Sequence, residues 1–572
     1  MSKLLLICPR RPGTRPVTDD DVRRLAARIL PDNIRPNPPA VTTEHGVLTA
    51  VLNPVESVAT HGAGACLGRP IDLADDWWTP GSPAPDGTFA LFRVDRNTVE
   101  LRTNILASRN IWYARTDDLF VASSSQRAIV SVLRGFRLDP RVLPWFLCTG
   151  ATGPGLSWDR RIRFLGPDGT LTLDRGRWTT RLDEPDVTFE PDPAPADEHL
   201  ARLHEALDET FRRLPLDPQR WLLPLSGGFD SRAILLFLVK HGLRPACATW
   251  GLAVWEGRPN TDLAVAAELA AHFGLEHRYY HIDPNAATVD EFLDRFITLC
   301  DGRYDGVEAY VDGFQTWKTF FEEGAAGVIR GEQAFGEPPV HTEPDARIDR
   351  NLGLFSDYAN LGDPADYGLE EPVLPDRLSR RTGESLATWR DRLYQDYTMP
   401  YVFGALNELK ACYVETLDPL TSGRIVRQVR TLPDKLRDDK ALFCDLVRAI
   451  TPDIGFPRHA VVPHPWDVMR TREVVERVTD ELENGPARAL LSDRLVDRII
   501  AGVDVRHEAV PRRRTVWRDR IKRVIPQAVR KKLRSSVIKP SMDWNVLAFR
   551  AYVISRMSRI LDQDADLLPR NP

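Results

Sequence analysis

The sequence has few cysteines and no long apolar run. Its seven cysteines lie far apart and none forms a Cys-x-x-Cys pair, which argues against a zinc site and a disulfide framework and predicts reduced, buried thiols. The apolar residues 4–8 are too few for a signal peptide, and no later stretch approaches the length of a membrane helix. We therefore expect a cytoplasmic protein without a membrane partner.

The net charge of the chain is also small. The sequence holds 76 lysines and arginines against 81 aspartates and glutamates, a net charge of −5 at pH 7. A protein that binds nucleic acid over its surface normally carries excess positive charge, so nucleic acid is not an expected partner. At 572 residues, the chain is long enough for more than one domain and a sizeable core.

A proline-rich acidic segment separates two regions with different patterns. Residues 186–200 hold little apolar surface and are predicted to be a linker. Within residues 1–185, strand-like runs such as 88–94 and 119–122 alternate with turns, which favours a β-rich α+β domain. Residues 201–572 form the second predicted domain.

Strands and helices alternate in the second region. The apolar runs 222–225, 245–250 and 326–330 are typical of buried strands. Thr288 and Glu291 have the spacing of a capping box at the start of a helix. This alternation predicts a parallel, doubly wound sheet whose ligand lies at the carboxyl ends of the strands.

The most informative segment is a Ser-Gly-Gly-Phe-Asp-Ser run between an apolar strand and an apolar helix. A helix N-terminus favours an anion, and Gly227 and Gly228 let the main chain approach it without a Cβ in the way. Ser226 and Ser231 add hydroxyl donors. Asp230 would repel a polyphosphate unless a divalent cation lay between them, which predicts Mg²⁺ bound to Asp230.

This run differs from the Walker motif, which requires Gly-x-x-x-x-Gly-Lys-Ser/Thr. An ordinary capped turn is the alternative interpretation. The run resembles the pyrophosphate loop of the N-type ATP pyrophosphatases, which cleave ATP between the α and β phosphates, so the resemblance implies ATP as cofactor. The superfamily includes tRNA-thiolating enzymes, but the missing Cys-x-x-Cys pair argues against that class.

Later segments resemble the asparagine synthetase family within that superfamily. Residues 331–336 look like the family's "GDELFG", residues 414–420 like its "LExRxPFLD", and residues 432–442 like its "LPxxLRxxxxKxxL". In the first region, residues 86–92 and 121–128 look like parts of the family's glutaminase domain. The resemblance therefore extends over both predicted domains.

The resemblance implies roles for four further residues. Gly331 would contact pyrophosphate, and Glu332 would join Asp230 in holding Mg²⁺. Glu415 would orient or deprotonate the amine nucleophile, and Lys440 would supply a catalytic positive charge. The alternative interpretation makes Glu415 a surface acid on a helix and Lys440 an exposed base.

The chain departs from the family at two places. The family's glutaminase nucleophile is a cysteine exposed as the first residue, but residue 2 here is serine and Cys8 lies inside a predicted strand. The first domain is therefore interpreted as a degenerate, Ntn-hydrolase-like remnant, and the amine arrives as ammonia or on a substrate. The family's late lysine is also missing, and Arg458, Lys440 and Lys539 are candidates to replace it.

Residues 512–539 are strongly basic. They are interpreted as amphipathic helices with a solvated basic face, or alternatively as a docking surface for a leader peptide or carrier protein.

Taken together, these patterns predict an α/β protein with a degenerate glutaminase-like α+β domain and a parallel-sheet ATP pyrophosphatase domain. The expected activity is ATP-dependent, amide-forming ligation of a small-molecule or peptide substrate that offers a carboxylate and an amine, in specialised-metabolite or peptide biosynthesis. The alternatives are a lasso-peptide-type macrocyclase, an ammonia-dependent asparagine synthetase, or a nucleotide-binding scaffold without turnover. A β-lactam synthetase is disfavoured because Ile329 stands where those enzymes have a tyrosine.

Overall fold

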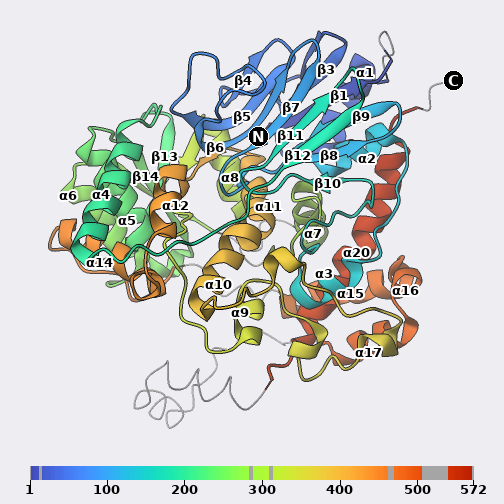
Figure 1. Cartoon of the computed structure of the whole chain (residues 1–572). Helices are drawn as coiled ribbons and strands as arrows, with labels where there is room; N and C mark the ends of the chain where they lie inside the picture. The colour runs from blue at the N-terminus through green and yellow to red at the C-terminus, as the bar shows by residue number, and fades with distance from the viewer. Residues whose placement is uncertain are drawn as a thin grey trace.

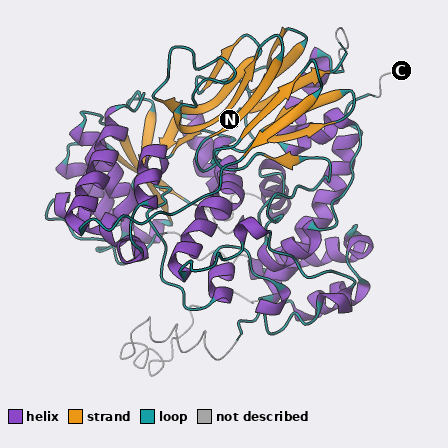
Figure 2. Cartoon of the chain, in the orientation of Figure 1, coloured by secondary structure: helices purple, strands orange, loops and turns teal. Residues whose placement is uncertain are grey.

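The structure is a computed structural model that describes residues 2–11, 16–282, 288–307, 313–461, 469–505 and 539–569. Antiparallel sheets form the N-terminal part of the chain, and a parallel sheet flanked by helices forms the next part (Figures 1 and 2). This arrangement confirms the predicted α/β class with an antiparallel first region and a parallel second one.

The N-terminal part contains two six-stranded antiparallel sheets, with strand orders β10-β8-β9-β1-β3-β2 and β12-β11-β7-β6-β5-β4. Their strands are β1 (Lys3–Pro9), β2 (Ala40–Glu44), β3 (Val47–Leu52), β4 (Val58–His61), β5 (Gly64–Ile71), β6 (Asp86–Val94), β7 (Thr98–Thr103), β8 (Trp112–Arg115), β9 (Leu119–Ser123), β10 (Arg163–Phe164), β11 (Thr170–Asp174) and β12 (Thr179–Asp183). The strands predicted at 88–94 and 119–122 are confirmed as β6 and β9.

The two antiparallel sheets share one apolar core. Leu4 and Leu6 of β1 pack into the same buried cluster as Phe92 of β6. The alternate residues of β1, Leu5 and Ile7, belong to a different cluster with helices α1 (Asp19–Ile29) and α2 (Gln126–Leu133). Because successive side chains of a strand point to opposite faces, one face of β1 packs against the other sheet and the opposite face packs against the helices.

The second region is built on a five-stranded parallel sheet of order β15-β14-β13-β16-β17. Its strands are β13 (Trp221–Pro224), β14 (Ala246–Gly251), β15 (His277–His281), β16 (Gly327–Ile329) and β17 (Glu415–Leu417). Helices α5 (Phe229–Lys240), α6 (Asp262–His272), α7 (Val289–Leu299) and α8 (Gly313–Glu322) connect the first four strands. The predicted strands, parallel sheet and Thr288 capping box are all confirmed.

Some of the remaining helices lie beside the parallel sheet, and others lie below the antiparallel layers, away from it (Figure 1). They are α3 (Val142–Thr149), α4 (Ala196–Arg212), α9 (Glu343–Asp349), α10 (Leu386–Leu393), a π-helix (Tyr394–Phe403), α11 (Gly404–Ala411), α12 (Gly423–Arg430), α13 (Asp434–Arg437), α14 (Ala441–Ile450), α15 (Arg472–Asn484), α16 (Ala487–Leu490), α17 (Asp493–Gly502) and α20 (Trp544–Ala565).

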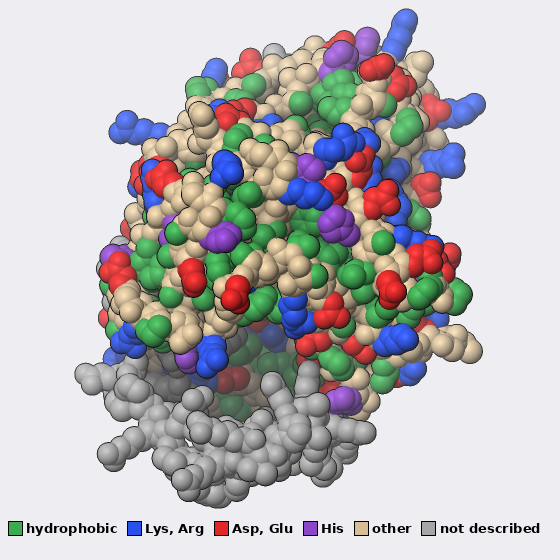
Figure 3. Space-filling view, turned by 90° about the vertical axis from the view of Figure 1, so that its left-hand side faces the viewer, with side chains coloured by type: hydrophobic (Ala, Val, Ile, Leu, Met, Phe, Trp, Pro, Cys, Tyr) green, Lys and Arg blue, Asp and Glu red, His purple; other side chains and the backbone are tan. Residues whose placement is uncertain are grey.

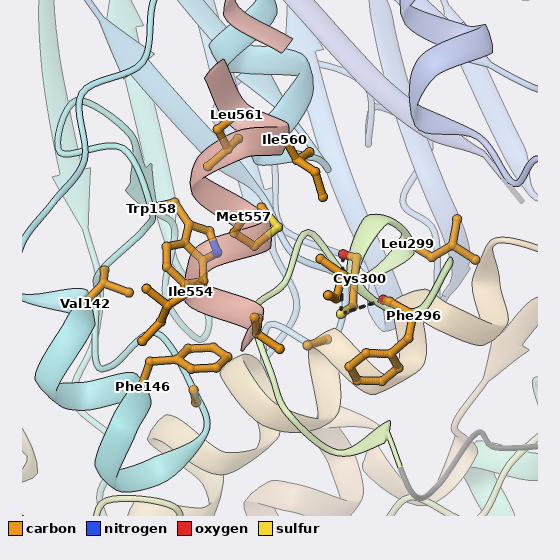
Figure 4. Close-up of a cluster of buried hydrophobic side chains, with 14 of the residues drawn as sticks. Val142, Phe146, Trp158, Phe296, Leu299, Cys300, Ile554, Met557, Ile560 and Leu561 are labelled. Atoms are coloured by element: carbon orange, nitrogen blue, oxygen red, sulfur yellow. Dashed lines mark hydrogen bonds between the residues drawn. The ribbon is translucent and has the colours of Figure 1, made fainter. Parts of the chain in front are cut away.

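Helix α20 ties the two regions together. Figure 4 shows Ile554 and Met557 of α20 among Phe146 of α3, Trp158, and Cys300 at the end of α7. An ion pair between Arg127 of α2 and Asp564 of α20 is fully buried. Helix α20, near the end of the described chain, therefore packs into the same core as helices from the N-terminal region. All seven cysteines are buried and free, as predicted.

The predicted linker follows the surface of the second region. Between β12 and α4, the backbone amides of Glu190 and Asp192 donate to the carbonyls of Arg430 and Thr431, at 3.0 and 2.8 Å. These contacts fix the segment against the end of α12. Among the described residues, no helix is long and apolar enough to cross a membrane.

Charged side chains of both signs are interspersed over the face that carries α4, α5 and α6 (Figure 3). The basic segment 512–539 lies outside the described residues except for Lys539, whose ammonium donates to the carbonyl of Ser356 at 2.7 Å. The predicted helices and docking surface of that segment therefore stay predictions.

Candidate active site

The Ser-Gly-Gly-Phe-Asp-Ser run forms a tight loop, the glycine loop (residues 226–231), between β13 and α5. Gly227 has a φ of +73°, and a Cβ there would lie 2.5 Å from the Val265 side chain, so the turn requires glycine. Gly228 is the N-cap of α5 and offers no side chain to its first amides. The loop therefore presents an open helix N-terminus at the carboxyl end of a central strand.

Gly331 lies directly against the glycine loop. A Cβ on Gly331 would be 3.0 Å from the Cβ of Asp230, a distance that only glycine makes comfortable. Gly331 follows β16, the strand next to β13, so adjacent parallel strands deliver both segments to one edge of the sheet. The structure thus brings the two predicted phosphate and metal segments together.

A cavity of about 320 Å³ opens at this edge, and we call it the loop cavity. Five of the predicted residues line it, namely Ser226, Asp230, Ser231, Gly331 and Glu332. Its volume is at the lower end of the range for small-molecule sites, which are commonly found at the carboxyl ends of such strands.

Lys440 reaches the same cavity through Asp230. The Lys440 ammonium lies 2.8 and 3.0 Å from the two carboxylate oxygens of Asp230. The backbone of Lys440 is left-handed, with a φ of +57°, just before α14 begins. A positive charge therefore stands next to the glycine loop, as the sequence predicts.

Glu332 is buried beside other charges. Its carboxylate pairs with Arg330 at 2.8 Å. Burial raises the pKa of Glu332 to about 7; the nearby carboxylates of Asp418 and Asp230 act in the same direction, and Arg330 opposes them. A metal ion or a bound cation would favour the charged form of this carboxylate.

Asp418 is a member of this charged group that the sequence analysis missed. It follows β17 as Glu332 follows β16, and it is buried, with both carboxylate oxygens lacking a hydrogen-bond donor among the described residues. Burial raises its pKa to about 6. The signal that could have located it is topological, because residues just after neighbouring parallel strands meet at one edge.

Glu415, by contrast, lies away from the glycine loop. It begins β17 in register with Gly327, the first residue of β16, which puts it at the opposite end of the sheet. Its buried carboxylate pairs with Arg109 from the N-terminal region and accepts the Thr416 amide at 2.8 Å. The alternative interpretation, a surface acid on a helix, is therefore wrong. Glu415 is not among the residues that line the loop cavity, and its role toward the amine stays a prediction.

A segment from 454 to 461, which we call the strap, borders the loop cavity and is anchored by Arg232. The Arg232 guanidinium donates to the carbonyls of Gly227, Ile454 and Gly455, and it stacks on Phe456 at 3.9 Å. At its other end, Val461 lines the cavity. A buried arginine two residues after Asp230 was not recognised in the sequence as a link to this segment.

Asp262 lines the loop cavity from the first turn of α6. Burial raises its pKa to about 6, and a backbone hydrogen bond from Val461 opposes that shift. Neither Arg458 nor Lys539 is among the described residues that line the cavity. Lys440 does not line the cavity either, but of the three candidates for the missing late lysine it is the one that contacts a lining residue, Asp230.

The carboxylates present suit a magnesium ion that is shared with phosphates. Among the described residues, no three or more histidine, cysteine, aspartate or glutamate side chains are grouped as a metal site. Mg²⁺ beside nucleotides commonly takes only one or two carboxylates and completes its octahedron with phosphate oxygens and water. Asp230 and Glu332, which face one cavity, are the residues that would hold it.

The first region has little space where a glutaminase pocket would be. The gap among Ser2, Lys3, Arg109, Asn110 and Glu408 measures about 10 Å³, roughly the space of a single water molecule. The Lys3 ammonium pairs with Glu408, and the Ser2 hydroxyl donates to the carbonyl of Asn53 at 2.6 Å. Side chains of this chain therefore fill the space beside Ser2 and Lys3.

Comparison with known proteins is informative over one part of the chain. Residues 202–309 match the asparagine synthase family model, and this stretch holds the glycine loop and α4 to α7. That part of the chain is asparagine synthase-like, which supports an enzyme of the ATP-dependent C–N ligase kind. No curated protein matches the chain significantly.

Solved structures resemble the chain only distantly. NMN synthetase from Francisella tularensis is 19% identical over 25% of this chain and 56% of its own, with a TM-score of 0.16. The allosteric regulatory enzyme of purine biosynthesis is 8% identical, over 50% of this chain and 82% of its own, with a TM-score of 0.21. Glutamine PRPP amidotransferase from B. subtilis is 9% identical, over 59% of this chain and 83% of its own, with a TM-score of 0.20. The chain spans about half of the length of the NMN synthetase.

Proposed function

We propose that this asparagine synthetase-like chain is an ATP-dependent ligase that activates a substrate carboxylate as its adenylate and joins it to an amine, without using glutamine. The observation that carries this proposal is the loop cavity, where an open helix N-terminus, Asp230, Glu332 and Lys440 converge. This set offers hydrogen-bond donors for an anion, carboxylate ligands for a metal ion and the ammonium group of Lys440. It lies at the carboxyl ends of the strands, where open parallel sheets bind ligands.

The proposed reaction has two steps. A carboxylate oxygen of the substrate attacks the α-phosphorus of ATP, the bond to the bridging oxygen breaks, and pyrophosphate leaves. The amine nitrogen then attacks the activated acyl carbon, loses a proton, and displaces AMP. The chain contributes mainly by positioning the reactants and by stabilising charge.

Each charged group has a place in that scheme. The amides at the start of α5 and the hydroxyls of Ser226 and Ser231 would bind the departing pyrophosphate. Magnesium held by Asp230 and Glu332 would neutralise its charge. Lys440, which pairs with Asp230, would supply positive charge beside the phosphates.

The blocked pocket of the first region supports the choice of amine donor. With Lys3 and Glu408 filling the space, free glutamine has no site there. The nitrogen would arrive as ammonia or as the amine of a substrate, in keeping with a role in specialised-metabolite or peptide biosynthesis. The substrate would carry a carboxylate and an amine on one molecule or on two.

Release of pyrophosphate from ATP tests the proposal. We would supply magnesium with aspartate and ammonium chloride, and separately with peptides that offer an N-terminal amine and an acidic side chain. Asp230→Asn should lower pyrophosphate release by at least about 100-fold, as loss of a charge-stabilising group in an enclosed site does. Asp208→Asn is the matched control, because Asp208 pairs with Lys240 on the outside of α4 and α5.

Two outcomes would contradict the proposal. Tight ATP binding without pyrophosphate release, with every carboxylate and amine supplied, would indicate a nucleotide-binding scaffold. Equal pyrophosphate release by the wild type and Asp230→Asn would remove Asp230 from the metal site.

A further inference from the structure

A second, larger cavity lies between the two regions and serves no part of the proposed reaction. Its volume is about 680 Å³, and we call it the interface cavity. One wall comes from β6, β7 and the loop after β7, and the other is α12 of the second region. It shares no lining residue with the loop cavity. Small-molecule sites commonly lie at such interfaces and have volumes of this order.

Arginines enter the interface cavity from both walls. Arg102 comes from β7, and Arg424 and Arg427 come from α12. Arg430 lies one turn after Arg427 on the same helix, and one of its guanidinium nitrogens is enclosed without a hydrogen-bond acceptor. The Nε of Arg430 donates to the side chain of Gln395 at 2.8 Å. An enclosed guanidinium nitrogen without an acceptor is costly, so the remaining nitrogen of Arg430 would gain from a further acceptor beside α12.

The aspartates of the same walls already have other partners. Asp72 pairs with both Arg424, at 2.9 Å, and Arg213, at 2.6 Å. Asp86 accepts hydrogen bonds from the backbone amides of Gly423 and Arg424, at 2.6 and 3.2 Å, and so caps α12. Each carboxylate is therefore held in place by groups other than Arg427.

The two acids that act on Arg430 are occupied in the same way. Asp168 pairs with Arg102 at 2.8 Å, and Asp396 pairs with Arg377 at 3.1 Å. Burial lowers the pKa of Arg430 to about 10, and the charge of Arg427 adds to that effect. Among the described residues, Arg427 forms no ion pair. Positive charge on α12 is thus left uncompensated where the cavity opens.

We propose that the interface cavity binds a small polyanion, a molecule with two or more carboxylate or phosphate oxyanions on a short apolar skeleton. Arg427 would bind one oxyanion in the forked geometry that guanidinium groups favour. Arg102, on the opposite wall, donates to Asp168 and Thr170 through its terminal nitrogens and would offer its unpartnered Nε to the second oxyanion. Phe89 and Ile105 supply apolar wall between them. A ligand seated there would contact both regions of the chain at once.

The test is calorimetric titration of the full chain with citrate and, separately, with inorganic phosphate at constant ionic strength. Arg427→Gln should weaken binding by at least ~10-fold, the effect of losing one charge-assisted contact of about 1.4 kcal/mol. Arg427 is exposed, so this variant keeps its fold. Arg177→Gln, an equally exposed arginine on the turn between β11 and β12, is the matched control and should bind like the wild type.

Because the glycine loop also attracts anions, Ser226→Asp is the second variant. Binding that survives Ser226→Asp and is lost in Arg427→Gln supports the proposal. Binding that is lost only in Ser226→Asp places the anion at the glycine loop, and no difference among the variants leaves the interface cavity without a ligand; either result overturns the proposal. Comparison of citrate with phosphate separates carboxylates from phosphates as the preferred oxyanion.

Discussion

The role of each buried carboxylate in this protein depends on where its ion-pair partner lies. Asp230 pairs with Lys440 and Glu415 with Arg109, and each of these pairs joins segments that are far apart in the sequence, whereas Glu332 pairs with Arg330 of its own segment. A carboxylate whose partner lies in the loop cavity is available for chemistry. One whose partner lies between the two regions holds the structure together.

Replacement of Glu415 should therefore affect stability more than turnover. Glu415→Gln keeps the side-chain volume but leaves the buried Arg109 without its carboxylate, which should lower the free energy of unfolding by about 3 kcal/mol. Urea unfolding measures the loss. Glu276→Gln breaks an exposed pair with Arg278 and should change stability by less than about 0.5 kcal/mol. Lost turnover with unchanged stability would return Glu415 to the catalytic site.

The raised pKa of Glu332 predicts a pH dependence of stability. The folded chain holds this proton up to a pH of about 7, whereas the unfolded chain releases it near 4.5. Between those values the folded state binds more protons, so stability should fall as the pH rises, by at most about 1.4 kcal/mol per unit. Thermal unfolding between pH 4.5 and 8 tests this, and Glu332→Gln should flatten the profile. Identical profiles for wild type and variant would contradict it.

The residue-scale predictions from sequence succeeded where a motif fixes the backbone. Gly227, Asp230 and Gly331 lie together because the turn between strand and helix requires a glycine at 227, and the close contact with Asp230 requires a glycine at 331. Glu415 lies outside the loop cavity because the acid stands at the beginning of its strand, not at the end. Asp418 was missed because nothing in the local sequence marks a buried carboxylate without a partner.

At the scale of elements, the strap depends on the glycine loop through one side chain. Arg232 donates to carbonyls in both segments, so the strap should loosen when Arg232 is replaced by methionine. Because the strap borders the loop cavity, the KM for ATP should rise by roughly 10-fold, the effect of losing about 1.4 kcal/mol of binding, with a smaller change in kcat.

Steady-state kinetics of Arg232→Met and Arg448→Met would check this prediction. Arg448 also lies over an aromatic ring, that of Phe229 at 5.0 Å, but it donates to no strap carbonyl. It therefore controls for loss of an arginine beside a phenylalanine. Equal effects of the two replacements would show that Arg232 does not hold the strap.

The strands and the capped helix that the sequence predicted have patterns that are local. The strand-helix alternation after residue 220 and the Thr288 capping box each depend on residues within a few positions of one another. The π-helix Tyr394–Phe403 gave no such signal. Its buried side chains pack against distant segments, including Ile105 and Ala334, and that packing has no counterpart in local sequence.

At the scale of the whole molecule, two predicted domains share one continuous interior. The Arg109–Glu415 and Lys3–Glu408 pairs cross from the first region to the second, and Arg127–Asp564 joins α2 to the last described helix. The change in sequence pattern across the linker corresponds to the change from antiparallel to parallel sheets. The sequence did not indicate that α20 packs against both regions, because contacts between residues far apart in the chain produce no local periodic pattern.

The chain should therefore unfold as a single cooperative unit. We expect one transition by scanning calorimetry, since the core around α20 includes helices from both regions. Asp564→Asn leaves Arg127 and Arg28 facing a neutral group and should lower the midpoint of that single transition. Two separated transitions in the wild type would show that the regions are thermodynamically independent.

The position of α20 also affects how the chain must be made. Arg127 and Asp564 are 437 positions apart, and a ribosome that adds 5–20 residues per second needs roughly 20–90 s to cover that interval. Throughout that time, the apolar faces of α2 and α3 lack the helix that will cover them and remain open to association with other nascent chains. Yield during expression should accordingly depend on chaperones that shield apolar surface until translation reaches residue 565.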